Sequence, residues 1–269
     1  MKSRIALVAL LLCFAVAGVL QAHDMFLKLD SYFLTPGDTL RVPLLNGTFT
    51  KSENAIDFER VRDVALLDTG VVTHPAPIAW HAEHDTTFFG LALKREGTYV
   101  LGVATKPREL RLKAADFNAY LKEEGITDIL ERRKKLGQLD KSATERYAKN
   151  VKAVFQVGEA TTANVAKPLG FPAEIVPLDN PYVGQRNGAL RFRCLVDGKP
   201  VAGMTVLAGS QRGHEVPVEH SFVSDAQGVV TMRITRPGHW YVKFVRMVPV
   251  GRGGIDYESK WATLTFEVR

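Results

Sequence analysis

The chain has 269 residues, and its 35 Lys and Arg against 29 Asp and Glu give a formal charge of +6 at pH 7. This small basic excess comes without a recognition motif or base-stacking aromatic residues, so we exclude a nucleic acid as partner. The only cysteines are Cys13 and Cys194. Cysteine-based zinc sites and paired redox cysteines are therefore excluded as well.

The first 22 residues have the order of regions found in a secretory signal peptide. A short basic start precedes an apolar run that ends at Leu20, and Ala22 is the small residue before the cut. The run is short for a bilayer span, which takes about 20 residues. We predict a periplasmic or secreted protein with no transmembrane segment after cleavage and with His23 as its first residue. Leu20 stands where a small residue is commoner, so a neighbouring cleavage site stays open.

Residues 23–112 are predicted to form an N-terminal β-sandwich domain. Leu40, Val42 and Leu44 alternate with Thr, Arg and Pro, which is the period of a half-buried strand. Turn-forming Gly, Pro and Asn residues separate this strand from its neighbours. Further strands are expected at residues 61–67, 87–93 and 98–103.

Residues 113–156 change to a helical pattern and are predicted to form an insert between two β regions. Phe117, Tyr120 and Leu121 fall on one helical face. Gly125 is expected to end this first helix. The insert is amphipathic, and we expect its apolar face to pack on a sheet.

The later part of the insert is also predicted to be helical. It begins with a capping box at residues 142–145, in which a Ser hydroxyl and a Glu carboxylate satisfy exposed backbone N–H groups. The apolar residues at helical spacing are Tyr147, Val151, Val154 and Phe155. The basic run at residues 132–135 is interpreted as a solvated helix face.

Residues 157–269 are predicted to form a second β-sandwich, of the Ig-like or transthyretin-like kind. A strong turn, Asp-Gly-Lys-Pro, stands at residues 197–200, and Cys194 is expected in the core of a strand. Seven strands are expected at residues 173–177, 190–196, 204–208, 216–222, 229–234, 240–246 and 262–268. The fold class is therefore mainly β, with two β-sandwich domains and a helical insert.

Two sets of short segments resemble known families. The first is similar to transthyretin-like modules of extracytoplasmic proteins and comprises residues 198–206, 224–228 and 237–242. The second spans nearly the whole mature chain and comprises residues 22–27, 36–38, 117–125, 145–152, 174–182 and 257–266. It resembles a bacterial periplasmic domain-of-unknown-function family whose members are often labelled as the periplasmic component of nickel or cobalt ABC uptake systems. This resemblance implies Ni or Co as the metal and a membrane metal-uptake transporter as the partner.

Histidines supply the candidate metal ligands, because neutral imidazole binds Ni, Co, Cu and Zn well. As a mature N-terminus, His23 would offer its imidazole together with an α-amine that has a pKa of about 8. His81 and His84 follow two prolines in a predicted loop, where binding residues often lie. They are the expected partners of His23, although a polar hairpin tip explains them equally well. His214 and His220 are weaker candidates.

We predict an extracytoplasmic, non-enzymatic protein that binds Ni²⁺, Co²⁺ or Cu²⁺ and captures the metal or delivers it to an uptake system. The sequence has no Gly-x-Ser-x-Gly elbow and no phosphate-binding glycine loop, and we assign no catalytic residue. Two alternatives stay open. One is a β-sandwich module that binds a glycan, a surface polymer or a partner protein. The weaker one is a copper oxidase built on an N-terminal histidine brace.

Overall fold

The computed structural model describes residues 23–183 and 188–269. The predicted signal peptide, residues 1–22, lies outside these ranges, so its cleavage stays a prediction. Within the described residues no helix has both the length and the apolar character needed to cross a membrane.

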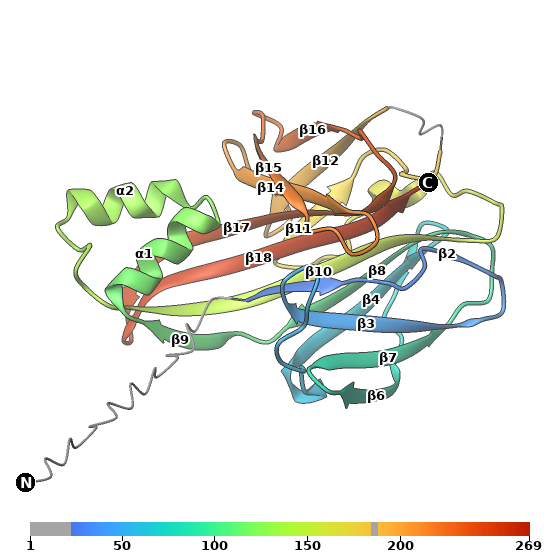
Figure 1. Cartoon of the computed structure of the whole chain (residues 1–269), viewed down its shortest axis with the longest axis horizontal. Coiled ribbons are helices and arrows are strands. Elements are labelled where there is room, and N and C mark those ends of the chain that lie inside the picture. Colours follow the sequence, from blue (N-terminus) through green and yellow to red (C-terminus); the bar gives the residue numbers. More distant parts are fainter. Residues whose placement is uncertain (1–22, 184–187) are drawn as a thin grey trace, which may run out of the picture.

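One long sheet runs through the molecule and joins its N-terminal and C-terminal β regions (Figure 1). Within the described residues this sheet has ten strands. In spatial order its main path is β15 (Val218–Val223), β14 (Thr205–Gln211), β17 (Gly238–Arg252), β18 (Ile255–Val268), β10 (Ala143–Val157), β8 (Gly97–Thr105), β4 (Val61–Asp68) and β5 (Val71–Thr73). Two further strands, β2 (Phe33–Leu34) and β9 (Arg108–Leu112), pair with β10.

Two smaller sheets cover opposite faces of the long sheet (Figure 1). The N-terminal one comprises β1 (Asp24–Leu27), β3 (Thr39–Gly47), β7 (Thr86–Ala92) and β6 (Ile78–Glu83). The C-terminal one comprises β11 (Ala173–Pro177), β12 (Ala189–Val196), β13 (Lys199–Pro200) and β16 (Val229–Arg233). In the described part of the chain, two single-turn 3₁₀ helices lie in connections, at Phe58–Arg60 and Asn164–Ala166.

Each small sheet builds a separate apolar core with the long sheet. Val42 and Phe89 of the N-terminal sheet pack with Leu101 and Phe155. Phe192 of the C-terminal sheet packs on the other face of the long sheet, with Phe244 and Phe266 among its neighbours. Cys194 is buried in this second core, as predicted. The expected fold class, mainly β with β-sandwich packing and a helical insert, is confirmed.

The helical prediction for residues 142–156 is wrong, because this segment is strand β10 (Ala143–Val157). The strand pairs in parallel with β18 on one side and antiparallel with β8 and β9 on the other. From Lys149 to Val157 every residue is buried. A strand that is covered on both faces shows no alternation of apolar and polar residues, so the pattern of its apolar residues resembled that of a helix.

Two helices, within the described residues, form a hairpin at one end of the long sheet: α1 (Ala114–Glu123) and α2 (Thr127–Lys135) (Figure 1). Phe117, Tyr120 and Leu121 of α1 are buried as predicted, and they pack with Tyr257 and Trp261 of β18. The helices therefore lie on the face of the long sheet that also carries the N-terminal small sheet.

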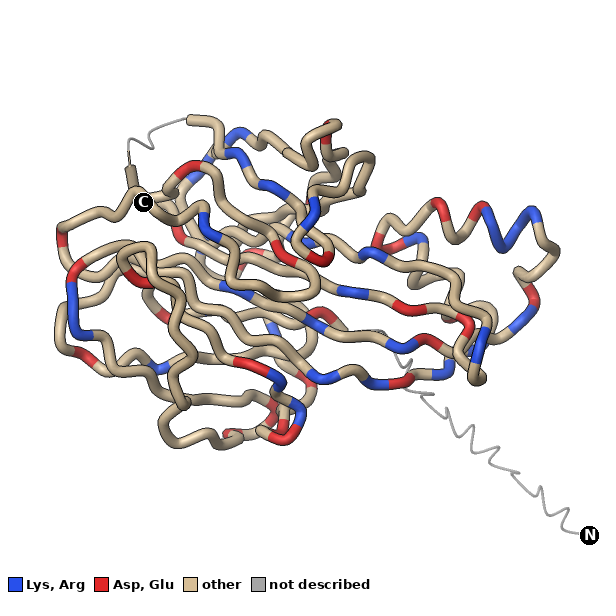
Figure 2. Tube along the Cα trace, turned by 180° about the vertical axis from the view of Figure 1, so that it is seen from behind, with Lys and Arg blue, Asp and Glu red and all other residues tan. Residues whose placement is uncertain are grey.

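The basic run of α2 is only partly a solvated face. Figure 2 shows its Lys and Arg residues together along the helix, but Arg133 is 2% exposed. Its guanidinium donates to Asn118 Oδ1 at 2.9 Å and to the carbonyls of Gln138 and Lys141 at 2.7 and 2.6 Å. It also lies 4.9 Å from the ring centroid of Phe117. Arg133 thus fastens the helical hairpin to the segment that leads into β10.

Candidate functional site

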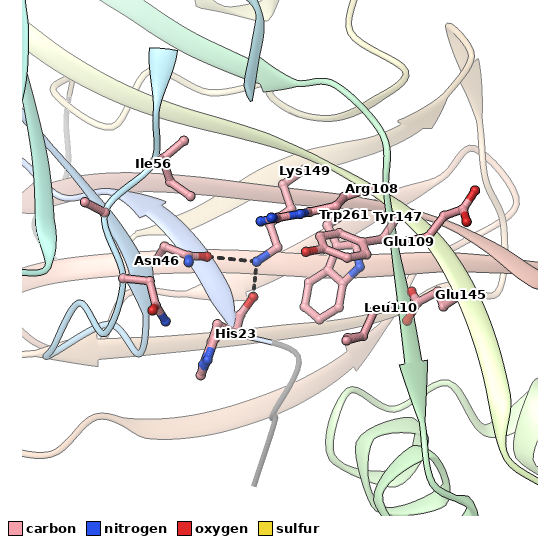
Figure 3. A pocket seen from close by; sticks show the side chains of 12 residues that line it. His23, Asn46, Ile56, Arg108, Glu109, Leu110, Glu145, Tyr147, Lys149 and Trp261 are labelled. Carbon is pink, nitrogen blue, oxygen red and sulfur yellow. Dashed lines mark hydrogen bonds between the residues drawn. The ribbon is translucent and has the colours of Figure 1, made fainter. Parts of the chain in front are cut away.

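A cavity of about 490 Å³ opens between the N-terminal small sheet and the β9–β10 ladder (Figure 3). This volume is within the usual range for small-molecule sites. The lining residues come from five parts of the chain that are distant in sequence. They are His23, Asn46, Asn54, Ala55, Ile56, Arg108, Glu109, Leu110, Glu145, Tyr147, Lys149 and Trp261.

Strand geometry explains why three chemically different side chains of β10 meet here. Glu145, Tyr147 and Lys149 are two residues apart, so they point to the same face of the strand. Their cross-strand partners share that face. In the β9 and β18 registers, Arg108 is opposite Tyr147, and Trp261 is opposite Lys149.

Lys149 is the buried cation of the cavity, with 5% of its surface exposed. Its ammonium donates to the main-chain carbonyl of His23 and, at 3.1 Å, to Asn46 Oδ1 (Figure 3). The Nζ atom lies 5.5 Å from the ring centroid of Trp261 and 5.6 Å from that of Tyr147. Burial lowers the pKa of Lys149 to about 8, against the attraction of Asp24.

Glu145 is the buried acid of the cavity, with 1% exposed. Its Oε1 atom accepts a hydrogen bond from Tyr120 at 3.1 Å and another from Ser259. Its Oε2 atom is buried and has no hydrogen-bond partner among the described residues. Burial raises the pKa of Glu145, because a carboxylate in a poorly solvated place is less stable than the neutral acid.

His23 lies at the start of β1 and at the edge of the cavity (Figure 3). Its Nδ1 atom is 3.0 Å from Glu53 Oε2, in the loop after β3. The two side chains are 23% and 36% exposed, so solvent and ions reach them. Lys149 holds the carbonyl of His23, which fixes the main chain at this position.

Next to His23, a second charged group surrounds Lys243 on β17. Its ammonium lies 2.7 Å from Asp24 Oδ2, 3.0 Å from Glu124 Oε2 and 3.7 Å from Glu219 Oε2. Burial alone would lower the pKa of Lys243, but these three carboxylates together raise it. Burial and the charge of Asp24 raise the pKa of Glu124 to about 8. The cluster joins β1, the end of α1 and β15 around one lysine.

The predicted partners of His23 lie on the hairpin of β6 and β7. His81 hydrogen-bonds the carbonyl of Ala79 at 2.7 Å and Glu83 Oε1 at 3.0 Å. These two bonds raise the pKa of His81, which disfavours the neutral imidazole that a metal needs. His84 is exposed at the hairpin turn, with φ of 53°. Neither histidine lines the cavity at His23.

The loop that carries Glu53 does contact the His84 turn, because Ser52 donates to the carbonyl of Asp85 at 2.6 Å. The weaker candidates are elsewhere. His220 is exposed on β15, and His214 is exposed in the loop before it. In residues 23–183 and 188–269 no group of three or more His, Cys, Asp and Glu side chains is placed to hold a metal ion. The site of His23, His81 and His84 therefore stays a prediction.

Sequence reasoning missed the three residues that the structure places around His23 and the cavity: Glu53, Glu145 and Lys149. Glu145 and Lys149 were assigned to a helix, on which they would share a face with each other but not with Tyr147. The pattern Glu-x-Tyr-x-Lys at residues 145–149, read with strand period, was the available signal. Glu53 reaches His23 through a loop, and no local pattern indicates such a contact.

Comparison with known proteins identifies the family of the chain. A family model described as "Domain of unknown function (DUF4198)" matches residues 20–247, which is most of the sequence. The chain belongs to the DUF4198 family. The expected membership of a family of unknown function is thus confirmed. None of the curated proteins matches this DUF4198 chain significantly.

Solved structures similar to the DUF4198 chain are distant. A DUF4785 family protein from Legionella pneumophila is 12% identical with a TM-score of 0.27, over 80% of this chain and 51% of that one. Trypsin-activated alpha-2-macroglobulin from Escherichia coli is 11% identical with a TM-score of 0.24, over 91% of this chain and 15% of that one. The D0-D1 domain of Intimin is 12% identical with a TM-score of 0.20, over 91% of this chain and 98% of that one. The chain spans about half of the Legionella protein, and scores this low support no argument about function.

Proposed function

We propose that this DUF4198 protein, exported and cleaved before His23, binds a transition-metal ion at its N-terminus. The ion is Ni²⁺, Co²⁺ or Cu²⁺, and the protein captures it or delivers it to a membrane uptake system. The observation that supports this proposal best is the 3.0 Å contact between His23 Nδ1 and Glu53 Oε2. A metal ion bound by both atoms would replace this contact.

The donor set fits such an ion. Two neighbouring ligands at right angles, each about 2.1 Å from a metal, are separated by about 3 Å. Cleavage would add the α-amine of His23, which closes a chelate ring with its own imidazole and has a pKa of only about 8. The resulting set has two nitrogens and one carboxylate oxygen. Imidazole nitrogen with carboxylate suits divalent Ni, Co and Cu.

The surroundings of His23 favour an ordered site. Lys149 and Asn46 form a fixed hydrogen-bonded pair behind the His23 carbonyl. Asp24 is held by Lys243, which anchors the next residue of β1. A main chain fixed at two successive residues limits the freedom of the imidazole and the amine, so less entropy is lost when an ion binds.

The test is metal binding by the mature protein purified from the periplasm, with N-terminal sequencing and titration calorimetry for Ni²⁺, Co²⁺ and Cu²⁺. His23→Ala and Glu53→Gln should each weaken binding, and one added Gly before His23 should weaken it too, because it converts the amine to an amide. The matched controls are His81→Ala and Glu83→Gln, a pair with the same chemistry on the β6–β7 hairpin. We expect the controls to bind as the parent does.

Four results would count against this proposal. A mature sequence that starts elsewhere than His23 would remove the amine ligand. Equal binding by the parent protein and by the form with the added Gly would show that the N-terminus is not a ligand. If His81→Ala weakens binding as much as His23→Ala, the three-histidine set from the sequence is favoured. No uptake of any of the three metals would favour the interaction module.

A further inference from the structure

The cavity beside His23 contains the ammonium of Lys149, which has fewer hydrogen-bond acceptors in the described residues than it has N–H donors. Lys149 has three N–H donors, and two of them are occupied by the His23 carbonyl and by Asn46. No ion pair within the described residues involves Lys149. A buried ammonium without a carboxylate partner is costly, and a bound anion would remove that cost.

Arg108 adds a second positive charge at the same end of the cavity. It lines the cavity (Figure 3). In the β9–β10 register Arg108 is opposite Tyr147, whereas Leu110 is opposite Glu145, so Arg108 is on the Lys149 side of Leu110. Glu109, the next residue on β9, also lines the cavity, and Arg146 pairs with it at 3.4 Å. The negative charge of Glu109 is thus already paired with an arginine.

Glu145 marks the opposite end of the cavity. Its Oε1 atom accepts two O–H bonds, so in the neutral acid the proton belongs on Oε2. That atom is buried without a partner among the described residues, and the residue lines the cavity. An O–H group in this position is a donor without an acceptor, which is uncommon in buried surroundings. A ligand oxygen would satisfy it.

The distance between the two ends sets the size of the ligand. Glu145 and Lys149 are four residues apart on one strand, so their Cα atoms are about 13 Å apart at the usual rise. Their side chains and hydrogen bonds fill part of this length. The ring of Tyr147 lies between them, and Trp261 and Leu110 complete the wall. A single planar ring with one polar group at each end fits this arrangement.

We propose that the cavity binds a small aromatic carboxylate that carries an oxygen acceptor opposite its carboxylate. The carboxylate pairs with Lys149 and Arg108, the ring lies against Tyr147, and the acceptor oxygen takes the hydrogen bond of Glu145. This site shares no side chain with the proposed metal ligands His23 and Glu53, so it does not depend on metal binding.

The test uses the whole mature protein in EDTA, with 4-hydroxybenzoate as the probe and titration calorimetry as the readout. Arg108→Gln should weaken binding several-fold. Its matched control is Arg111→Gln, which removes the same charge from the same strand but on the opposite face, where Arg111 bonds Ser142. Lys149→Met should weaken binding roughly tenfold to a hundredfold, the usual value of a hydrogen bond to a charged group.

Further variants separate this site from its neighbours. Glu145→Gln keeps a donor at the free position, so it should bind nearly as the parent does. His23→Ala should lose the metal but keep the probe, because Lys149 bonds the main-chain carbonyl of residue 23. Melting temperatures show whether each variant is folded. If Lys149→Met does not fold, the comparison of Arg108→Gln with Arg111→Gln still tests whether the probe binds in the cavity.

Three results would overturn this proposal. The first is equal weakening by Arg108→Gln and Arg111→Gln, which would indicate a general surface charge effect. The second is competition by acetate or phosphate as strong as that by benzoate, which would indicate an unselective anion site. The third is no heat of binding at millimolar probe. Weaker binding of 4-hydroxybenzamide, which lacks the charge, is expected.

Discussion

The ion pair between Lys152 and Glu174 gives the sharpest test of how the C-terminal small sheet is held on the long sheet. Lys152 is on β10 and Glu174 on β11, and their side chains are 1% and 2% exposed. The Nζ–Oε2 distance is 3.0 Å. The carboxylate also accepts main-chain N–H bonds of 2.7 to 2.9 Å from the three successive residues 169–171. Glu174 therefore has four donors, whereas Lys152 has a single carboxylate.

Because Glu174 has more partners than Lys152, we expect the two substitutions Glu174→Ala and Lys152→Met to lower the free energy of unfolding by different amounts. Glu174→Ala leaves a buried ammonium and three N–H groups without acceptors, so we expect a loss of about 3–5 kcal/mol in the free energy of unfolding. Lys152→Met leaves a carboxylate that three N–H groups still stabilise, so about 1–3 kcal/mol is expected. The control is Glu109→Gln, which breaks the exposed pair with Arg146 on the same strand β10 and should change stability by less than about 0.5 kcal/mol.

The assay is urea unfolding at pH 7, monitored by far-UV circular dichroism. The dependence of the free energy of unfolding on urea concentration, its slope, is compared between variants. A change in slope would mean that the unfolding is no longer two-state. The reasoning is refuted if Lys152→Met costs as much as Glu174→Ala. It is also refuted if Glu174→Ala costs no more than Glu109→Gln.

Two further predictions concern the helical hairpin. The pKa of about 8 for Glu124 means that the folded chain keeps a proton which the unfolded chain releases near pH 4.5. Stability should therefore fall by about 4 kcal/mol as pH rises from 4.5 to 8, and Glu124→Gln should flatten this fall. If the urea midpoint of Glu124→Gln depends on pH as that of the parent does, this prediction is wrong. Arg133→Met should cost about 2–4 kcal/mol, because two carbonyls and Asn118 lose a charged donor. Arg132→Met, its exposed neighbour, should cost less than about 0.5 kcal/mol, and similar thermal midpoints for both variants would show that the buried contacts of Arg133 are weak.

Local patterns predicted the strands that have one wet face or clear turn residues. In β3, Leu40, Val42 and Leu44 are buried and Arg41 is exposed. The alternation of apolar and polar residues therefore predicted this strand. The turn at residues 197–200 holds because Asp197 and Gly198 have φ of 50° and 73°, values that Asp and Gly tolerate better than most residues.

The candidate site was less accessible to sequence reasoning, for a physical reason. Lys149 is placed by three separate neighbours, namely the His23 carbonyl, Asn46 and Trp261. Such contacts between distant segments follow from the pairing of strands, which a single sequence does not specify. The N-terminal histidine was recognisable because its chemistry depends on one residue, but its acidic neighbour Glu53 was not.

The position of β18 has a consequence for the order of events during folding. The last 14-residue strand, Ile255–Val268, lies between β17 and β10 in the middle of the long sheet. An emerging chain can form hairpins from its early strands, but until the final residues are available one edge of β10 has only the short pairing of residues 156–157 with β2. Pairing across more than 100 residues is slow. An incomplete chain thus exposes the edge and apolar faces of β10, and truncation near residue 255 should lead to aggregation rather than to a smaller stable protein.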